Sequence, residues 1–482
     1  MQRTLTNQTP NFVGQDVKVS GWVDTRRDHG KIVFLDLRDR TGMLQVVCSP
    51  ELVEGIKDED VIEIEGKVQS RPEKMVNPEL ETGKVELQAQ IIKVLAKSEP
   101  LPFDIKELKV TLPTLLDFRP LSLKNPKIRA IFKIEEEIIN SFRRTLQELG
   151  FTEFQAPVIV PANAEGGAAV FHIDYYDYDA YLTQSPQLYK QITMQGFERV
   201  FAINKVFRAE PSVTTRHITE FISLDMEMSF IDSWEDLMDV AESVIRNMCS
   251  DIEKNCAKEM KLLGVVAPQL GEKIPRMKMR DAQEIIFERT KRDNRKEPDL
   301  EPDDEKEICE YTKEKFGSEV VFITHYPTKK RPFYTFTDPK DPDYTLSFDL
   351  LFRGLEVITG GQRINEYEKL VANIKKWGND PKDFEYYLQA FKYGMPPEGG
   401  FAIGLERIVK QILGLENVRE ASLFPRDMER IDEKLSLLQP LRPFNTTQGK
   451  HDSGQAEPKT AAKKPALKKT LTGTSSVRVN KK

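Results

Sequence analysis

The sequence of 482 residues predicts an α+β protein with a small N-terminal β-barrel, a larger domain built on a mostly antiparallel sheet, and a basic tail. Three observations lead to this prediction. Short strand-like runs fill residues 17–95, a long helical period covers 126–149, and strands then mix with helices as far as about residue 430. Because this last part lacks regular βαβ alternation, a parallel sheet is disfavoured.

Residues 17–95 contain five runs of alternating or β-branched residues, separated by turns that carry Gly or Pro. The runs are Val17–Val23, Lys31–Asp39, Met43–Ser49, Val61–Gln69 and Lys84–Leu95. Five strands over this length indicate a closed barrel of the OB type, which often binds single-stranded nucleic acid on one face. An ordinary small β-domain fits the same pattern equally well.

Residues 100–120 hold four prolines and little periodicity, so we expect a linker or hinge there. A long amphipathic helix follows, because Asn125 suits an N-cap, Pro126 the first helical position and Gly150 the residue after the last turn. A strand over 151–160 comes directly after the helix. Beyond it we expect strands at 199–210, 221–230, 319–327, 344–361 and 399–404, and helices at 234–258, 303–316 and 366–376.

The composition is that of a soluble globular protein, with 31% charged and 39% hydrophobic residues. No apolar run approaches the roughly 18 residues that span a bilayer, and the polar N-terminus does not resemble a signal peptide. The four cysteines form no CxxC pair, so neither a disulfide framework nor a structural zinc site is expected. We therefore expect a cytoplasmic protein with no membrane contact.

The net charge of −6 is unevenly distributed. Residues 448–482 carry nine Lys/Arg and two acids, which is +7 and leaves −13 for the rest of the chain. An acidic body argues against binding nucleic acid through bulk charge, so any contact should use local patches. The tail beyond about residue 441 is predicted to be disordered, and it serves either as a solubilising end or as a nonspecific arm for tRNA.

The common nucleotide and metal motifs GxxxxGK[ST], GxGxxG and HExxH are missing, so any nucleotide site must use other residues, and three segments offer candidates. The first is FRAEPSVTTRHITEF, residues 207–221, which has the pattern of two strands joined by a polar turn. Arg208 could bind a phosphate in a bidentate manner, and Phe221 could stack on a base. A solvated charged hairpin explains this segment equally well. Its polar candidates are Arg208, Glu210, Arg216, His217 and Glu220.

The second segment is FDLLFRGLEVITGGQRINEYE, residues 348–368. Asp349 and Glu356 could share a hard cation, and Thr359 could add a hydroxyl oxygen. Arg363 follows a Gly-Gly pair that permits close approach of a ligand. The alternative is a buried strand with exposed ends.

The third segment is GGFAIGLERIVKQILG, residues 399–414, a Gly-rich strand that enters a helix. Glu406 and Arg407 fall in the first turn of that helix, where an arginine beside free amide donors suits an anionic ligand. Taken alone, an ordinary helix start with an incidental arginine explains the segment better.

The ordered combination of the three segments resembles the motifs of class II aminoacyl-tRNA synthetases, and the chain is similar to their aspartate branch over residues 10–430. The resemblance implies an OB-fold anticodon-binding domain at 1–99, a hinge at 100–124, a class II catalytic domain of antiparallel sheet and flanking helices at 125–440, and the tail at 441–482. It also implies a homodimer, formed through the long helix and the strand with Pro157. The large extra domain of bacterial aspartate enzymes has no room between residues 221 and 399, and Ala402 replaces a glycine common in the third motif.

The resemblance implies that ATP binds on the sheet with Mg2+. Arg208 and Arg407 would be the catalytic residues, contacting the α-phosphate and the γ-phosphate respectively. Glu356, with Thr359 and Asp349, would hold Mg2+. The residues implied to bind ATP are Arg208, Glu210, Arg216, His217, Ile218, Phe221, Glu356, Gly404, Leu405, Glu406 and Arg407.

The stretch QSPQLYKQ, residues 184–191, matches the signature of the aspartate enzymes. Lys190 and Arg363 would face the side-chain carboxylate of L-aspartate, whereas the amide of asparagine would meet them donor to donor. Glu165 would hold the α-amino group and Gln187 would orient the substrate, with Arg208 and Thr359 completing this set. Residues 166–171 resemble a mobile loop that closes over the amino acid.

For tRNA, the resemblance places four residues of the barrel at the anticodon. Phe34 would stack on the middle base and Gln45 would bond its edge, with Arg27 at another contact position. His29 is similar to a histidine in relatives that charge both tRNA(Asp) and tRNA(Asn). The resemblance therefore implies an aspartate–tRNA ligase. The alternatives are an asparagine–tRNA ligase, suggested by residues 322–335, and a non-catalytic RNA-binding paralogue, which would usually have lost the arginines at 208, 216 and 407.

Overall fold

The computed structural model describes residues 1–161, 170–211 and 214–432. Its residue contacts divide the chain into two compact units. The first comprises Met1–Thr145, Ser243–Gln269 and Ile412–Gly414, and the second comprises Leu146–Glu242, Leu270–Gln411 and Leu415–Lys482. Glu165 and the basic tail, about which the sequence makes predictions, lie outside the described residues. Within the described part, no helix is both long and apolar enough to cross a membrane.

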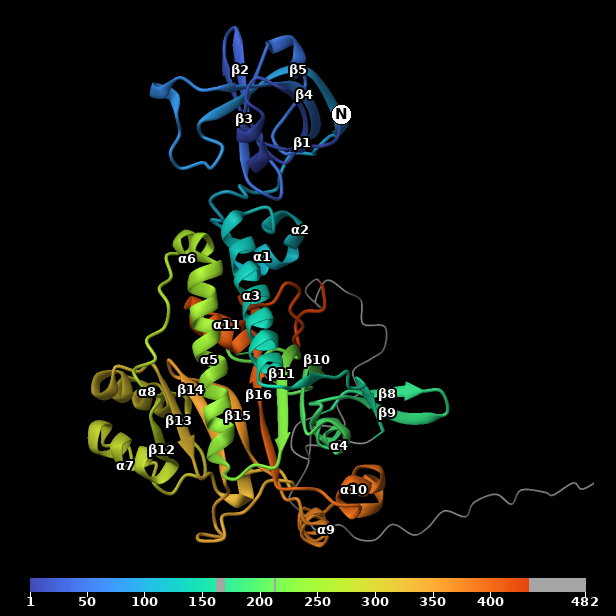
Figure 1. The fold of residues 1–482 in the computed structure, drawn as a ribbon, viewed down its shortest axis with the longest axis vertical. Helices are drawn as coiled ribbons and strands as arrows, with labels where there is room; N and C mark the ends of the chain where they lie inside the picture. Colours follow the sequence, from blue (N-terminus) through green and yellow to red (C-terminus); the bar gives the residue numbers. More distant parts are fainter. Residues whose placement is uncertain (162–169, 212–213, 433–482) are drawn as a thin grey trace, which may run out of the picture. The chain divides into compact units, whose positions relative to one another are not determined.

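The first unit begins with a closed five-stranded barrel in the order β1-β2-β3-β5-β4 (Figure 1). Its strands are β1 (Asp16–His29), β2 (Ile32–Arg38), β3 (Met43–Cys48), β4 (Val61–Ser70) and β5 (Val85–Ala96). Short 3-10 helices lie at Thr6–Phe12, Pro50–Val53 and Glu73–Met75. The pairing is antiparallel except between β3 and β5. The predicted OB-type barrel is confirmed.

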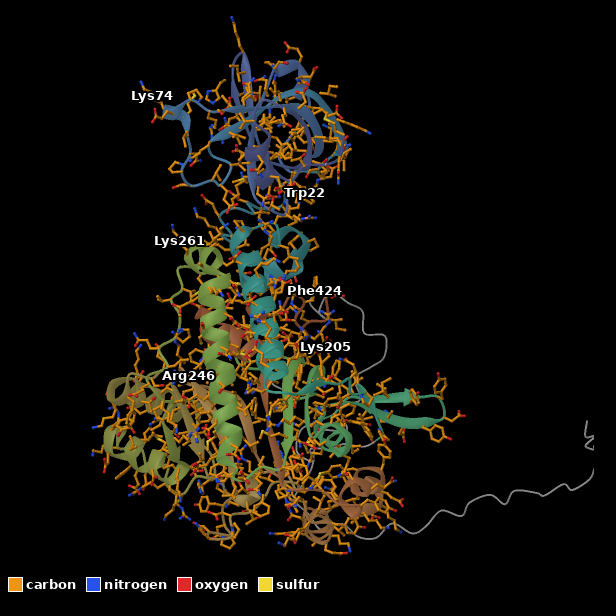
Figure 2. The ribbon with its side chains drawn as sticks, viewed as in Figure 1. Trp22, Lys74, Lys205, Arg246, Lys261 and Phe424 are labelled. Atoms are coloured by element: carbon orange, nitrogen blue, oxygen red, sulfur yellow. The ribbon has the colours of Figure 1, made fainter. Side chains whose placement is uncertain are left out.

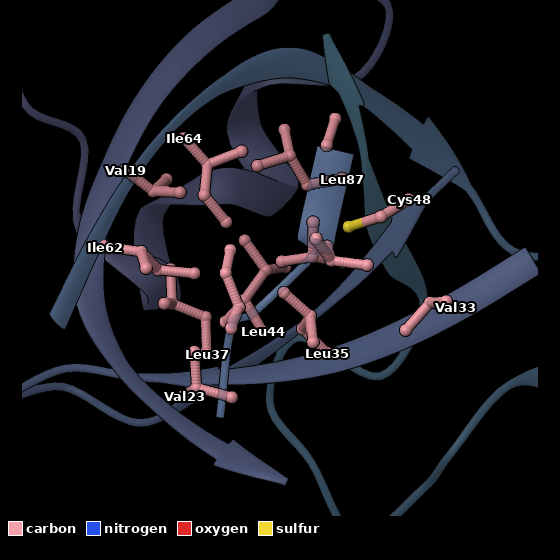
Figure 3. Close-up of a cluster of buried hydrophobic side chains, with 14 of the residues drawn as sticks. Val19, Val23, Val33, Leu35, Leu37, Leu44, Cys48, Ile62, Ile64 and Leu87 are labelled. Carbon is pink, nitrogen blue, oxygen red and sulfur yellow. The ribbon is translucent and has the colours of Figure 1, made fainter. Parts of the chain in front are cut away.

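Alternate residues of these strands fill the barrel (Figure 3). Leu35, Leu37, Ile62 and Ile64 are fully buried, as the period of two predicts. Gly66 allows β4 to approach β5 closely, because a Cβ there would lie 2.3 Å from the carbonyl oxygen of Gln88. The barrel is therefore closed by close backbone contact as well as by apolar packing.

The segment that was expected to be a plain linker contains two short helices, α1 (Leu112–Asp117) and α2 (Arg119–Ser122). Pro113 and Pro120 lie in their first turns, where proline is tolerated, so the prolines start helices here instead of excluding them. The long helix α3 (Pro126–Glu148) agrees with its prediction. Asn125 Oδ1 accepts a hydrogen bond from the Lys127 N–H at 2.8 Å, and Gly150 takes a positive φ of 80°.

The second unit is built on an eight-stranded sheet in the order β12-β13-β14-β15-β16-β11-β10-β6 (Figure 1). Its strands are β6 (Thr152–Glu153), β10 (Arg199–Phe207), β11 (Glu220–Ser229), β12 (Arg276–Lys278), β13 (Val320–Thr324), β14 (Ser347–Phe352), β15 (Leu355–Gln362) and β16 (Glu398–Gly404). Five neighbouring pairs are antiparallel, and β10 with β6 and β12 with β13 are parallel. The prediction of a mostly antiparallel sheet is confirmed.

Helices and a small second sheet complete the fold. The helices are α4 (Gln187–Phe197), α5 (Glu235–Asn255), α6 (Ala257–Leu263), α7 (Met279–Thr290), α8 (Pro302–Phe316), α9 (Tyr367–Lys376), α10 (Glu385–Lys392) and α11 (Leu405–Leu413), with 3-10 turns at Thr328–Lys330, Pro381–Phe384 and Val418–Ala421. The small sheet contains β7 (Ile159–Val160), β8 (His172–Tyr175) and β9 (Tyr178–Leu182). The sequence pattern did not predict α4, α7, α10 or the β8–β9 hairpin.

Two predicted strands are each divided in the structure. The run 344–361 forms β14 and β15, because Arg353 and Gly354 take positive φ values of 45° and 79° and reverse the chain between two apolar stretches. The run 151–160 forms β6 and β7, which belong to different sheets. The first break carries the turn pair Arg353-Gly354 and the second contains Gln155 and Pro157, and the apolar residues on both sides of each break made one longer strand the favoured prediction.

The barrel core supplies a stability prediction. Ile64→Ala removes a fully buried side chain and should destabilise the barrel by about 2–5 kcal/mol. Ile91→Ala removes one that is 59% exposed and should cost less than about 0.5 kcal/mol. Hydrogen exchange of the barrel peptides measures both changes. Equal effects of the two variants would contradict the assignment of the barrel interior.

Candidate active site

The three segments singled out in the sequence meet in one pocket of the second unit. The β10–β11 hairpin supplies one wall, β15 the floor and the junction of β16 with α11 the other wall. Arg208, Glu210, Arg216, His217, Ile218, Thr219, Phe221, Ser223, Glu356, Val357, Thr359, Ala402, Gly404, Glu406, Arg407 and Val418 line it. Leu405 is an exception among the predicted ATP residues, because it is the first residue of α11 and its side chain is fully buried in the core.

Arg208 and Phe221 lie at the loop end of the β10–β11 hairpin. The guanidinium carbon of Arg208 lies 5.5 Å from the centre of the Phe221 ring, within the range of a cation–π contact. Arg208 also lies 4.0 Å from Glu210, and both side chains are more than a third exposed. The pocket therefore offers a cation beside an aromatic face, which suits a ligand with a phosphate and a planar ring.

Arg216 forms an ion pair with Glu305 of α8. Burial raises the pKa of Glu305 to about 7, although Arg216 opposes this shift. Burial and then the charge of Arg407 lower the pKa of His217, so a neutral imidazole is favoured there. No motif in the sequence pointed to Glu305, which lies 89 residues from its partner.

The start of α11 brings Arg407 to β15. Its Nη1 donates to the carbonyl oxygen of Glu356 at 3.2 Å and lies 3.7 Å from Glu356 Oε2. The carboxylate of Glu406 accepts from the Ile222 N–H at 3.1–3.2 Å and so ties α11 to β11. Ala402 lines the pocket with only a methyl group, so this replacement for glycine leaves the space open.

The structure brings together the residues predicted to hold a metal, but the guanidinium of Arg331 already contacts two of them, Asp349 and Thr359. Asp349 and Thr359 are direct partners across β14 and β15. Arg331 lies 2.8 Å from Asp349 Oδ2, donates to Thr359 Oγ1 at 3.0 Å and stacks on Tyr326 at 4.0 Å. The sequence prediction missed Arg331, because nothing in Lys329-Lys330-Arg331 shows which of the three cations points inward.

The donor set still fits a divalent cation when a substrate supplies further oxygens. The buried Asp349 Oδ1 has no hydrogen-bond partner in the described part of the chain, and burial followed by repulsion from Asp349 raises the pKa of Glu356. Two carboxylates that repel each other are typical of a site that a cation completes. Among the described residues, no three His, Cys, Asp or Glu side chains form a metal site by themselves.

Next to this pocket lies a buried cluster of charges. Lys190 Nζ is 3.1 Å from Asp225 Oδ1 and 2.9 Å from Glu227 Oε2, and Arg363 Nε is 2.8 Å from Glu227 Oε1. Gln187 Oε1 accepts from Arg363 Nη2 at 3.4 Å. All five side chains are buried, so the two cations predicted to face a substrate carboxylate are already paired with Asp225 and Glu227.

The pKa shifts of the two carboxyl groups differ. Burial raises the pKa of Asp225, and the charge of Lys190 only partly offsets this. Burial would also raise the pKa of Glu227, but the charges of Arg363 and Lys190 together bring that pKa below its ordinary value. Glu227 is therefore the firmly ionised partner that both cations share. Neither Asp225 nor Glu227 was singled out in the sequence, because the strand pattern FISLDMEMSF shows no more than two acids on one side of a strand.

The four residues predicted at the anticodon lie on neighbouring strands of the barrel. Arg27 faces Phe34 across β1 and β2, and His29 packs edge-on against Phe34 with ring centres 5.5 Å apart. Arg27 forms two hydrogen bonds to Asp36, and Asp36 is opposite Gln45 on β3. The Gln45 side chain donates to Glu86 and accepts from Arg71. This polar face with one aromatic ring suits an unpaired nucleic-acid strand.

The comparisons with known proteins agree with this geometry. Residues 111–428 match the family of class II tRNA synthetases (D, K and N), and residues 17–95 match the OB-fold nucleic acid binding domain. The chain belongs to this family of aminoacyl-tRNA ligases.

Individual relatives are similar over nearly their full length. The chain is 42% identical over 435 residues to the aspartate–tRNA(Asp/Asn) ligase of Thermus thermophilus, covering 89% of this chain and 99% of that protein. It is 38% identical over 434 residues to the aspartate–tRNA(Asp) ligase of Pyrococcus abyssi, covering 88% and 97%. Among solved structures, the asparaginyl-tRNA synthetase of Pyrococcus horikoshii with asparaginyl-adenylate has a TM-score of 0.81 at 31% identity, covering 89% of this chain and 99% of that one.

The buried charge cluster supplies a second stability prediction. Lys190→Met leaves Asp225 and Glu227 buried with one cation fewer, and we expect a loss of about 3–5 kcal/mol. Lys205→Met is the control, because Lys205 is 54% exposed where it pairs with Glu220 (Figure 2) and should cost at most about 1 kcal/mol. Denaturant unfolding at pH 7 measures both. A small effect of Lys190→Met would show that the cluster does not support the fold.

Proposed function

We propose that the protein is an ATP-dependent aspartate–tRNA ligase that forms aspartyl-adenylate and transfers the aspartyl group to the 3′ end of tRNA. The observation that carries this proposal is the buried pair Lys190 and Arg363 beside a pocket lined by Arg208, Arg216 and Arg407. A substrate carboxylate could replace part of the pairing of Lys190 and Arg363 with Asp225 and Glu227, whereas an amide N–H₂ would meet these two cations donor to donor. Names of relatives such as those of Thermus thermophilus and Pyrococcus abyssi point the same way.

The first chemical step joins aspartate to AMP. The α-carboxylate oxygen of aspartate attacks the α-phosphorus of ATP, a new O–P bond forms, and pyrophosphate leaves with the electrons of the broken bond. We propose that Arg208 holds the α-phosphate and the attacking carboxylate, and that Arg407 holds the γ-phosphate. Phe221 would stack on the adenine. No side chain has to accept a proton, so the contribution of the protein is positioning and electrostatic stabilisation.

In the second step a ribose hydroxyl of the tRNA 3′ end attacks the carbonyl carbon of the adenylate and a new C–O bond forms. AMP leaves with the electrons of the broken bond between the carbonyl carbon and the phosphate oxygen, and the hydroxyl proton passes to the departing phosphate. When bound, Mg2+ would neutralise charge on the phosphates, and Glu356, Asp349 and Thr359 would hold it. Glu165 would bind the α-amino group and Gln187 would orient the substrate.

We also propose that the protein forms a homodimer through the long helix α3 and the following segment that contains Pro157. A cytoplasmic location stays a prediction, and it agrees with the four cysteines, which are all buried and form no disulfide.

The direct test is pyrophosphate exchange. The wild-type protein should exchange pyrophosphate into ATP when aspartate is present, and Arg208→Gln should lower the rate by about 10²–10³ because a donor to the developing charge is lost. Arg289→Gln is the matched control, since Arg289 pairs with Glu307 and Glu314 on the surface of α7 and α8. Exchange with asparagine alone would make the protein an asparagine–tRNA ligase, and no exchange with either would favour a non-catalytic paralogue.

We further propose that the barrel binds the anticodon and that both tRNA(Asp) and tRNA(Asn) are charged with aspartate. Phe34→Ala should raise the KM for tRNA about 5–100-fold, because base stacking on an aromatic ring contributes about 1–3 kcal/mol. Pyrophosphate exchange should stay unchanged. Ile32→Ala, on the same strand and 44% exposed, is the control.

Parallel charging of purified tRNA(Asp) and tRNA(Asn) decides the specificity. Charging of tRNA(Asp) alone would show a discriminating enzyme and remove any role for His29 in accepting both tRNAs.

A further inference from the structure

A third carboxyl group, Glu398 at the start of β16, is fully buried beside the Lys190–Glu227–Arg363 cluster. Gln191 of α4 donates to Glu398 Oε1 at 2.6 Å, and the other oxygen, Oε2, has no hydrogen-bond donor among the described residues. Glu227 lies on the neighbouring strand β11, two residues from Ser229, which pairs with Glu398, and apart from its ion pair with Lys190, Glu227 Oε2 also has no hydrogen-bond partner among the described residues. Two buried carboxylates this close repel each other when both are ionised, and a proton on one of them relieves the repulsion.

The surrounding hydrogen bonds show which carboxyl group that is. Gln191 Oε1 accepts from the Tyr387 hydroxyl at 3.0 Å and from Gln187 Nε2 at 2.9 Å, so the amide of Gln191 has only its N–H groups left for Glu398. Glu227, in contrast, is bound by both Lys190 and Arg363. The cations stabilise the negative charge on Glu227, and Glu398 is left with neutral donors.

The groups that face Glu398 act in the same direction. Burial and then the charge of Glu227 raise the pKa of Glu398 well above its ordinary value, while Arg363 opposes them. Tyr387 of α10 is also buried, with its pKa raised, and stays neutral. With Glu398 neutral, the charges of Lys190 and Arg363 balance those of Asp225 and Glu227. With Glu398 ionised, the cluster would be negative at the place where a dicarboxylic amino acid is to bind.

We propose that Glu398 is a positioning residue that stays protonated at neutral pH and donates its proton to Glu227, which keeps the amino-acid pocket receptive to a substrate carboxylate. The identity of the substrate in this inference rests on the proposed function. The protonation of Glu398 is independent of that function.

Glu398→Gln tests the proposal, because its amide keeps one acceptor for Gln191 and one donor for Glu227 without the ability to ionise. At pH 7 the KM for aspartate in pyrophosphate exchange should stay within about twofold of the wild-type value. As the pH rises, the KM of the wild type should increase relative to that of the variant, because only the wild type gains a negative charge. A change at pH 7 of more than about fivefold in either direction, or parallel pH profiles, would overturn the proposal.

Infrared difference spectroscopy provides a readout that does not depend on activity. The C=O stretch of a protonated carboxyl should be present in the wild type and lost in Glu398→Gln. It should also be lost in Glu227→Gln, because removing the neighbouring charge lets Glu398 ionise. Glu319→Gln should retain it, since Lys313 and Arg353 pair with that carboxylate. The wild-type-minus-variant difference spectrum cancels bands from other protonated carboxyls such as Glu305. If this spectrum shows no lost C=O band for Glu398→Gln, the protonation is refuted. If the band is lost but the wild type shows no aspartate-dependent exchange, only the function is refuted.

Discussion

The carboxylate of Glu227 joins four elements of the second unit. It lies on β11, binds Lys190 of α4 and Arg363 just after β15, and lies against β16 at Gly400. A Cβ at Gly400 would come 2.1 Å from Glu227 Oε2, so only glycine leaves room for the carboxylate. Because a buried charge costs several kcal/mol unless it is paired, these elements can pack only in the arrangement that satisfies it. The proposed amino-acid site at Lys190 and Arg363 therefore depends on this constraint.

The pocket lined by Arg208, Arg216 and Arg407 and its surroundings pair arginines with acids in a similar way. Arg216, Arg331 and Arg407 each lie against an acidic side chain, namely Glu305, Asp349 and Glu356. Arg331 lies outside the pocket lining and donates to Thr359 of that lining. These ion pairs balance the charges of the arginines and hold their positions. Under the proposed function, the phosphates of ATP would replace part of this pairing, and preorganised charge of this kind stabilises a phosphoryl transition state.

The barrel achieves a binding surface by different means. Its core cluster is built from apolar side chains. Its strands β1, β2 and β3 present Arg27, Phe34 and Gln45 on a face whose polar groups are hydrogen-bonded to one another. The alternation that buries Leu35 and Leu37 is the same alternation that exposes Phe34 and Asp36 beside them. Stability and recognition therefore use opposite faces of the same strands.

Local patterns in the sequence were sufficient for the five barrel strands, the helix capped by Asn125, and the β10–β11 and β16–α11 segments, because periodicity and capping act over a few residues. They also singled out Arg208, Phe221, Glu356 and Arg407 as pocket residues. The break at Arg353-Gly354 and the division of 151–160 escaped prediction because the apolar stretches that flank each break outweighed the short turn signals within it.

The partners of the charged residues depended on tertiary structure. Glu305, Arg331, Asp225, Glu227 and Glu398 lie far along the chain from the groups that they bind, and nothing in the neighbouring sequence shows which acid or base will turn inward. Their contacts also determine their charges, as the opposite pKa shifts of Glu227 and Glu398 show. The sequence by itself therefore determined which chemical groups are available, and the packing of the sheet decided which of them meet and which remain ionised, because both depend on burial and on distances between distant segments.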